Sequence, residues 1–267
     1  MHALPCPSHA VILAAGLGSR LRPLTNRIPK PLVAVHGVPI LHNALTQLGE
    51  SGVRSATIVV GYRQDAIRRA CGTRFAGVDI HYVESPVYDR TGSAYSLWLA
   101  RDALTSGDCL LLEGDVFFEA DALTRLVEAG HPDVAAVAPF DETMEGSAVT
   151  LSATGHVDRL RMRQTAADLE TSPSRLFKTM NLFRFSAETL RRILVPALDE
   201  LIGAGMVSAY TEQLLAALVE ERGLKLAAAR CDAVRWFEID SAADLEIAER
   251  IFADLAEIRP IRAATAP

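Results

Sequence analysis

The sequence has few cysteines, a deficit of basic charge and no long apolar run, and each shortage excludes a class of protein. Its four cysteines are scattered without a Cys-x-x-Cys pair, which indicates buried or incidental thiols and not a disulfide framework. The 27 basic residues are outnumbered by 33 acidic ones, which argues against binding nucleic acid or an anionic membrane surface. No apolar run reaches the roughly 18 residues that cross a bilayer, so no membrane span is expected.

The N-terminal stretch "MHALPCPSHA" lacks the charged start and apolar block of a signal peptide, so a cytoplasmic location is expected. With 267 residues, 49% of them hydrophobic and 22% charged, the chain has an ordinary globular composition. Such a chain can bury a substantial core.

Residues 1–140 alternate between strand-like and helix-like patterns. Apolar runs predict strands at 9–15, 55–61, 78–84, 109–118 and 132–140, and helical periodicity appears at 39–52, 63–72, 93–104 and 120–130. This alternation predicts an α/β fold with a doubly wound, mostly parallel mixed sheet and helices on both faces.

After residue 140 the pattern changes. A hairpin with a turn at Thr154-Gly155, a further strand, two helices and a final strand and helix are predicted at 147–162, 177–186, 187–202, 208–222, 236–240 and 241–258. We expect residues 141–235 to form an inserted α+β layer, after which residues 236–258 return to the sheet. The tail, 259–267, is expected to be a frayed end or a linker to a further domain.

Residues 11–32, "VILAAGLGSRLRPLTNRIPKPL", contain the most informative motif. Without side chains at Gly16 and Gly18, the backbone can approach phosphate oxygens and donate hydrogen bonds to them. Arg20 and Lys30 can then neutralise the phosphate charge, so the loop predicts a cradle for a nucleoside triphosphate.

Other interpretations of the loop fit less well. A P-loop requires Gly-Lys-Ser/Thr after its glycine, which is absent here, and a dinucleotide fingerprint requires a third glycine where Leu21 stands. A tight glycine turn with solvent-facing arginines is the structural alternative.

The string from Leu13 to Leu32 closely resembles the N-terminal signature of the sugar-nucleotidyltransferase-like superfamily. The resemblance continues at "EGDVFF", "FKTMNLFRFS" and "WFEIDSAADLEIAE", so it covers essentially the whole chain. It implies a Rossmann-like nucleotidyltransferase fold as one domain over 1–258, with a nucleotide-binding half (1–140), an acceptor-binding or lid portion (141–235) and a C-terminal return (236–258). It also implies nucleotide contacts from Leu13, Ala14, Ala15, Gly16, Gly18, Ser19, Arg20, Lys30, Gly92, Ser93, Ala94 and Asp115.

Two carboxylates stand at predicted strand ends, Asp115 after "LLLEG" and Asp240 after "RWFEI". Strand ends at one sheet edge could hold Mg²⁺, which prefers oxygen ligands, and the resemblance assigns both residues to a metal. Glu238 shares the strand face of Asp240 and is a candidate third ligand or outer neighbour. Alternatively, Asp240 starts the following helix and Asp115 forms a turn.

Lys178 in "FKTMN" is the remaining catalytic candidate beside Arg20 and Lys30. An ammonium between an attacking phosphorus oxyanion and an α-phosphate would lower the barrier that their like charges create; a surface lysine is the alternative. The "Lys-Thr-x-Asn" stretch resembles that of cytidylyltransferases acting on small phosphonates. Acceptor contacts are predicted for Lys178, Asn181, Tyr210, Glu212 and Trp236, although Trp236 could be core and the helix of Tyr210 and Glu212 solvated.

Residues 89–100, "DRTGSAYSLWLA", match the superfamily's base-recognition segment, and Ser93 is also a candidate helix cap. The segment keeps the Tyr95-Ser96 of bacterial phosphocholine cytidylyltransferases but lacks their asparagine.

These patterns together predict a Mg²⁺-dependent cytidylyltransferase that uses CTP and a small phosphonate, 2-hydroxyethyl- or 2-aminoethylphosphonate, or phosphocholine, and releases pyrophosphate. A hexose-1-phosphate nucleotidyltransferase using dTTP, UTP or GTP is the alternative within the class. A non-catalytic nucleotide-binding regulatory subunit is the alternative from another class. The oligomeric state stays open, with a homodimer as one option.

Overall fold

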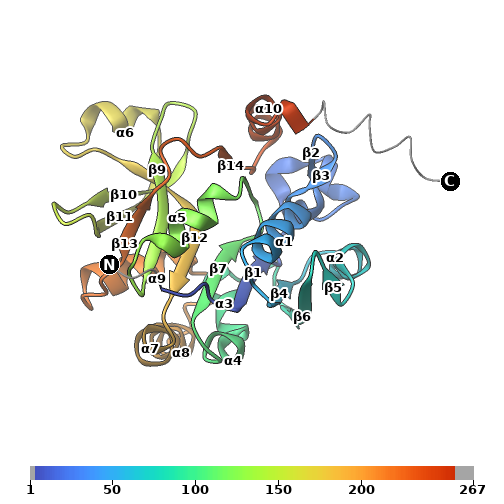
Figure 1. The fold of residues 1–267 in the computed structure, drawn as a ribbon, viewed down its shortest axis with the longest axis horizontal. Helices are drawn as coiled ribbons and strands as arrows, with labels where there is room; N and C mark the ends of the chain where they lie inside the picture. Colours follow the sequence, from blue (N-terminus) through green and yellow to red (C-terminus); the bar gives the residue numbers. More distant parts are fainter. Residues whose placement is uncertain (1–3, 256–267) are drawn as a thin grey trace.

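The computed structural model describes residues 4–255, and a large mixed sheet forms its centre (Figure 1). The strands follow one another across the sheet in the order β11 (Val157–Gln164), β10 (Gly146–Leu151), β12 (Phe177–Phe185), β7 (Cys109–Glu113), β1 (His9–Ala14), β4 (Ser55–Val60), β6 (Val78–Glu84) and β5 (Arg74–Phe75). A further strand, β9 (Val134–Pro139), pairs with both β12 and β13 (Ala227–Arg230).

The middle of the sheet is parallel, because β1 pairs in parallel with β4 and β7, and β4 does so with β6. Five of the six positions in both β1 and β4 are buried, as expected for strands covered on both faces. The chain places β4 and β6 on one side of β1 and then crosses to place β7 on the other. This reversal creates a crevice at the carboxyl ends of β1 and β7, where α/β proteins bind ligands.

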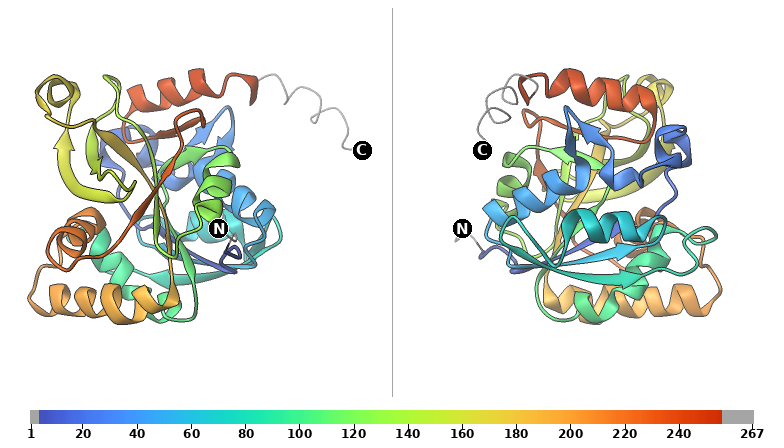
Figure 2. Two further views of the ribbon diagram at one scale, coloured as in Figure 1. Left: turned by 60° about the vertical axis from the view of Figure 1, so that its left-hand side comes forward. Right: turned by 90° about the vertical axis from the view of Figure 1, so that its right-hand side faces the viewer.

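Helices cover both faces of the sheet (Figure 2). Ala10, Ile12 and Ala14 pack with α1 (Ile40–Glu50), α2 (Gln64–Cys71) and α5 (Asp121–Glu128). Val11 and Leu13 point to the other face and pack with α3 (Ser93–Leu99), α4 (Arg101–Leu104), α8 (Val195–Gly203) and α9 (Thr211–Glu220). The two faces arise because successive side chains of a strand alternate, and the predicted α/β fold is confirmed.

The inserted layer predicted for 141–235 is an extension of the same sheet. All nine residues of β12 are buried, and this strand pairs antiparallel with β7 and β10 along one edge and with β9 along the other. Residues 177–185 therefore connect the two halves of the molecule, and side chains on β12 can reach the crevice beside β7.

The prediction that residues 236–258 return to the large sheet is wrong. β14 (Trp236–Glu238) pairs antiparallel with β8 (Val116–Phe118) in a separate two-stranded ribbon. The predicted strand 109–118 breaks at Gly114, whose amide donates to the Leu13 carbonyl and whose Cβ, if present, would lie 2.7 Å from that oxygen. The chain bends there and carries β8 out of the sheet.

The remaining elements are short or terminal. The hairpin of β2 (Ala34–Val35) and β3 (Val38–Pro39) and the helix α6 (Ala166–Thr171) were not predicted from the sequence. The residues before α8 include α7 (Ala187–Thr189). The last helix, α10 (Ala242–Ile251), lies within the predicted 241–258; positions 256–258 and the tail 259–267 lie outside the described residues. Within 4–255 we find no helix with the length and apolarity needed to span a membrane.

His9 at the start of β1 makes folding sensitive to acid. Its Nδ1 lies 2.8 Å from the Ser55 hydroxyl, while its buried Nε2 has no partner within residues 4–255. Burial, with help from His81, lowers the pKa of His9 below its ordinary 6.5. The unfolded chain then takes up a proton more readily than the folded one, so stability should fall as the pH drops below about 6.5. We expect His9→Gln to flatten the dependence of Tm on pH between 7 and 5; an unchanged slope would contradict this.

Candidate active site

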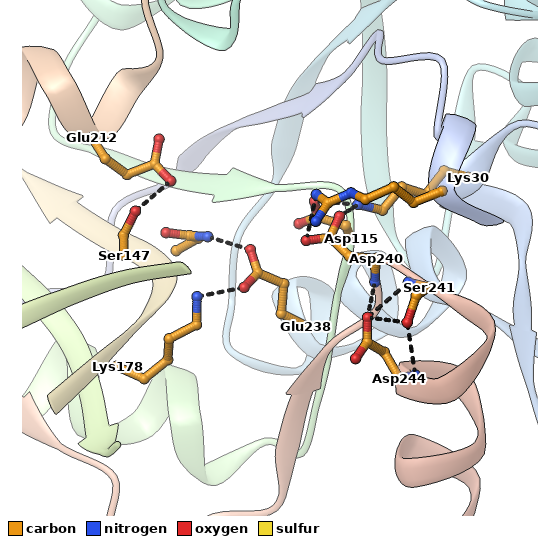
Figure 3. Close-up of polar contacts among 11 residues, drawn as sticks. Lys30, Asp115, Ser147, Lys178, Glu212, Glu238, Asp240, Ser241 and Asp244 are labelled. Carbon is orange, nitrogen blue, oxygen red and sulfur yellow. Dashed lines mark hydrogen bonds and ion pairs between the residues drawn. The ribbon is translucent and has the colours of Figure 1, made fainter. Parts of the chain in front are cut away.

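A cavity of about 1240 Å³ opens at the carboxyl ends of β1 and β7. Its walls come from the loop after β1, the start of α3, the turn after β7, strands β10 to β12, the start of α9 and the ribbon strand β14. Figure 3 shows the polar contacts on its floor. Residues from both halves of the chain therefore face one space.

The loop after β1 presents main-chain donors to the cavity. The amides of Gly16, Leu17 and Gly18 donate no hydrogen bond to any group within residues 4–255, while the Thr25 hydroxyl holds the Gly18 carbonyl at 2.8 Å. A Cβ on Gly16 would meet no atom within 4 Å. Gly18 has a left-handed φ of 60°, and its Cβ would lie 2.8 Å from the Lys30 Cβ. The loop thus resembles an anion-binding nest with space in front of it.

The two glycines should respond differently to alanine. Gly18→Ala combines a strained φ with a collision against Lys30, so we expect Tm to fall and the free energy of unfolding to drop by roughly 1–2 kcal/mol. Gly16→Ala meets no neighbour, so Tm should hold while affinity for a nucleoside triphosphate decreases. Thermal denaturation and equilibrium binding of CTP would separate the effects, and equal Tm losses in both variants would contradict the assignment.

Lys30 joins two carboxylates that are far apart in sequence. Its Nζ lies 2.8 Å from Asp115 Oδ2 and 2.5 Å from Asp240 Oδ1, and Arg20 contacts the other oxygen of Asp240 at 2.8 Å (Figure 3). Burial alone would lower the pKa of Lys30, but the two carboxylates outweigh it and raise that pKa. Burial would raise the pKa of Asp240, and Lys30 with Arg20 holds it below its usual range. Lys30 and Asp240 are therefore both charged at neutral pH.

Asp115 and Asp240 have the donor set that suits Mg²⁺. Asp115 Oδ1 is buried without a hydrogen-bond partner within residues 4–255, and both residues supply hard oxygens. Asp240 does not start the helix as a cap: Ser241 is the N-cap of α10 and accepts a hydrogen bond from the Asp244 amide. No group of three His, Cys, Asp or Glu able to hold a metal occurs among the described residues, so Glu238 does not complete a three-carboxylate cluster. Mg²⁺ commonly uses only one or two protein carboxylates, and the paired site stays a prediction.

Lys178 is 3% exposed, so the surface-lysine alternative is wrong. Its Nζ lies 2.6 Å from Glu238 Oε2, and the Asn181 amide donates to Glu238 Oε1 at 3.0 Å. Asn181 has a left-handed φ of 53° and is buried behind Glu238, and the Thr179 hydroxyl donates to its Oδ1. Burial, with Asp115 and Asp240 nearby, raises the pKa of Glu238 to about 7 against the opposing effect of Lys178.

The start of α3 is hydrogen-bonded to the start of α9, which links residues 1–140 to the second half of the chain. Gly92 is the N-cap of α3, so the prediction that Ser93 caps this helix is wrong. The Ser93 hydroxyl accepts a hydrogen bond from the Thr211 amide at 2.8 Å, at the start of α9. Gly92 and Ser93 line the cavity, whereas Ala94 is fully buried in the core and does not.

Comparison with known proteins identifies the first half of the chain. Residues 9–141, which contain the glycine loop, Lys30 and Asp115, match the family described as nucleotidyl transferase. These residues are a nucleotidyl transferase domain. The sequence prediction of this family is confirmed.

Two curated relatives differ in acceptor. The chain is 36% identical over 239 residues to the CMP-5'-(3-aminopropyl)phosphonate synthase of Streptomyces rubellomurinus. The matched region covers 89% of this chain and 38% of that protein. It is 38% identical over 112 residues to the UTP–glucose-1-phosphate uridylyltransferase AglF of Haloferax volcanii, covering 42% of this chain and 45% of that protein. The chain thus spans less than half the length of either relative. The inositol-1-phosphate CTP transferase of T. maritima shares the fold, with a TM-score of 0.76 at 21% identity, over 95% of this chain and 98% of the other.

The site residues predicted from the sequence lie at different depths in the cavity. Those that line the cavity are, besides Gly92 and Ser93, Leu13, Ala14, Ala15, Gly16, Gly18, Ser19, Arg20, Lys30, Asp115, Lys178, Tyr210, Glu212, Trp236, Glu238 and Asp240. Trp236 is 5% exposed and is both core and wall, whereas Tyr210 is 53% exposed at the rim. Glu212 is half-buried and accepts a hydrogen bond from Ser147, so its helix face is not simply solvated.

Glu113 and Ser147 are among the cavity residues that were not predicted from the sequence. Glu113 is an ionisable residue in the apolar run "CLLLEGDVFF" and lies two positions before Asp115. In a continuous strand over 109–118 this spacing would place both on one face, a signal that could have revealed Glu113. Burial, with Glu212 and Asp115 nearby, raises the pKa of Glu113 well above its usual range. Ser147 carries no comparable local signal, since only the pairing of β10 with β12 brings it to the cavity.

Proposed function

We propose that this protein is a Mg²⁺-dependent cytidylyltransferase that transfers CMP from CTP to a small phosphonate or to phosphocholine and releases pyrophosphate. One observation carries the proposal: the free loop amides, the Lys30–Asp115–Asp240 group and the buried Lys178 face a single cavity. The aminopropylphosphonate name of one relative supports the choice of base and acceptor. The chemistry needs cations around phosphates, and the cavity supplies them.

In the proposed reaction, a phosphonate or phosphate oxygen of the acceptor attacks the α-phosphorus of CTP. A new P–O bond forms there, the bond to the bridging oxygen breaks, and pyrophosphate leaves with the electron pair. The loop amides, Arg20 and Lys30 would hold the triphosphate and position the α-phosphorus. Lys178 would stabilise the negative charge that accumulates between acceptor and α-phosphate. The oxyanion is already deprotonated, so the step needs no general base and no covalent enzyme intermediate.

The residues fit a divalent cation, because Asp115 offers an unpartnered buried oxygen and Asp240 a second carboxylate beside it. These two residues would hold Mg²⁺. When bound, Mg²⁺ would supply positive charge shared among phosphate oxygens. Lys30 pairs with both carboxylates, and its positive charge limits their mutual repulsion.

Pyrophosphate release with a matrix of nucleotides and acceptors would test the proposal. We expect turnover with CTP, and with 2-aminoethylphosphonate, 2-hydroxyethylphosphonate or phosphocholine, in the presence of Mg²⁺. The uridylyltransferase relative favours a second candidate, hexose-1-phosphate nucleotidyl transfer. Turnover only with UTP, dTTP or GTP and a hexose phosphate would support that candidate and overturn the first. CTP binding without turnover of any acceptor would support a regulatory role instead.

A further inference from the structure

Two carboxylates of the cavity, those of Glu113 and Glu212, form no ion pair with any residue within 4–255. The other carboxylates deep in the cavity differ, since Asp115 and Asp240 pair with Lys30 and Glu238 pairs with Lys178. Withdrawing a carboxylate from water without a cation is unfavourable, and burial raises the pKa of both Glu113 and Glu212 for this reason. A cationic group on a bound molecule would stabilise their charged forms.

The side chain of Glu212 is held in a defined position. Glu212 is in the first turn of α9, whose start is attached to α3 through the hydrogen bond from the Thr211 amide to Ser93. The Ser147 hydroxyl, on a residue 4% exposed, donates to Glu212 Oε1 at 3.2 Å, while no other residue of the described chain donates to Oε2. Glu212 therefore offers the cavity a free carboxylate oxygen.

Lys178 lies beside this carboxylate. Ser147 precedes Ala148, which pairs with Lys178 across β10 and β12, and Lys178 acts electrostatically on Glu212. A Cβ on Gly146 would lie 2.8 Å from Lys178 Nζ, so glycine leaves room there for the ammonium. In Figure 3, Glu212 and Ser147 lie on the side of the Lys178–Glu238 pair away from Lys30 and Asp115.

This arrangement suits a short molecule with opposite charges at its ends. In the proposed reaction the acceptor places its phosphorus oxyanion near Lys178, and its other end then extends toward Glu212 and Ser147. Glu142 and Glu145 at the rim are exposed and solvated, so their charges do not require a cation on the ligand. Arg163 also lines the cavity but is exposed and solvated, so the half-buried ionisable group at this end of the acceptor is the carboxyl group of Glu212.

We propose that Glu212, with Ser147, binds a primary ammonium on the acceptor, so that the acceptor is a short ω-amino phosphonate or phosphate monoester. The inference rests on the proposed function and narrows it. A primary ammonium can donate hydrogen bonds to Glu212 Oε2 and to the Ser147 oxygen. A hydroxyl in its place carries no charge, and a quaternary ammonium has no N–H to donate and is recognised by aromatic faces instead.

Matched acceptors provide the test. We would measure kcat/KM for pyrophosphate release from CTP with 2-aminoethylphosphonate, phosphoethanolamine, 2-hydroxyethylphosphonate and phosphocholine. The wild type should prefer the amino over the hydroxy phosphonate by about 30-fold or more, and the phosphoethanolamine arm distinguishes phosphonate from phosphate. Glu212→Gln should reduce that preference at least tenfold, mainly through KM of the amino acceptor. The control Glu221→Gln removes an exposed charge at the opposite end of α9 and should keep the preference.

The outcomes separate the two proposals. Comparable kcat/KM for amino and hydroxy acceptors, a preference for phosphocholine, or an unchanged preference in Glu212→Gln would overturn the ammonium site while leaving cytidylyl transfer intact. Absence of turnover with every acceptor would overturn the proposed function. In that case, thermal shifts with CTP and Mg²⁺ decide: added stabilisation by 2-aminoethylphosphonate over 2-hydroxyethylphosphonate, lost in Glu212→Gln, supports the site, and equal shifts overturn it.

Discussion

Asp115→Ala is expected to lower kcat/KM for pyrophosphate release by roughly 10³-fold. Asp115 lines the cavity after the strand next to β1, contacts Lys30 and has a buried oxygen with no hydrogen-bond partner within residues 4–255. Its loss removes a proposed Mg²⁺ ligand and frees Lys30 from one of its two partners. Steady-state kinetics over a series of Mg²⁺ concentrations would measure the loss and show whether more metal is then required.

Two further variants show whether the effect is chemical. Asp115→Asn keeps the shape and one acceptor oxygen but removes the charge, so its loss of activity should approach that of alanine. Asp158→Asn removes an exposed carboxylate of β11 outside the cavity and should leave kcat/KM unchanged. Folding should survive in Asp115→Ala because Lys30 keeps its contact with Asp240. Full turnover by a folded Asp115→Ala protein would refute both the metal assignment and the proposed mechanism.

Lys178→Met is expected to reduce kcat by about 10²–10³-fold, since it removes the ammonium between two negative reactants. It also leaves Glu238 without its ion-pair partner in a buried setting, which should lower the free energy of unfolding by on the order of 3 kcal/mol. Kinetics and chemical denaturation together would measure the two effects.

A double variant separates the effect of Lys178 on kcat from its effect on stability. In Lys178→Met with Glu238→Gln, both charges are gone, and the glutamine oxygen still accepts from Asn181, so much of the lost stability should return. The kcat should stay low if Lys178 acts on the substrates. Recovery of kcat together with stability would mean that Lys178 only neutralises Glu238, and it would remove Lys178 from the proposed mechanism.

Local sequence patterns predicted many of the helices and strands. Residues 55–60 and 78–84 were predicted as strands because apolar and β-branched residues occupy consecutive positions in the first and alternate positions in the second, and α1 shows helical periodicity. The ribbon of β8 and β14 was missed for the opposite reason. Residues 116–118 look like a continuation of β7, and only contact of Gly114 with the Leu13 carbonyl bends the chain away.

The sequence by itself determined the glycine loop, the family of residues 9–141 and the identity of the charged residues, because these depend on neighbouring positions. The tertiary structure alone decided which charges meet. Lys30 contacts Asp115 and Asp240 across separations of 85 and 210 residues, and Ser147 reaches Glu212 across 65. Among the described residues, it also left Glu113 and Glu212 without an ion pair. Such contacts follow from how strands pair and helices pack over the whole chain, which no short stretch of sequence encodes.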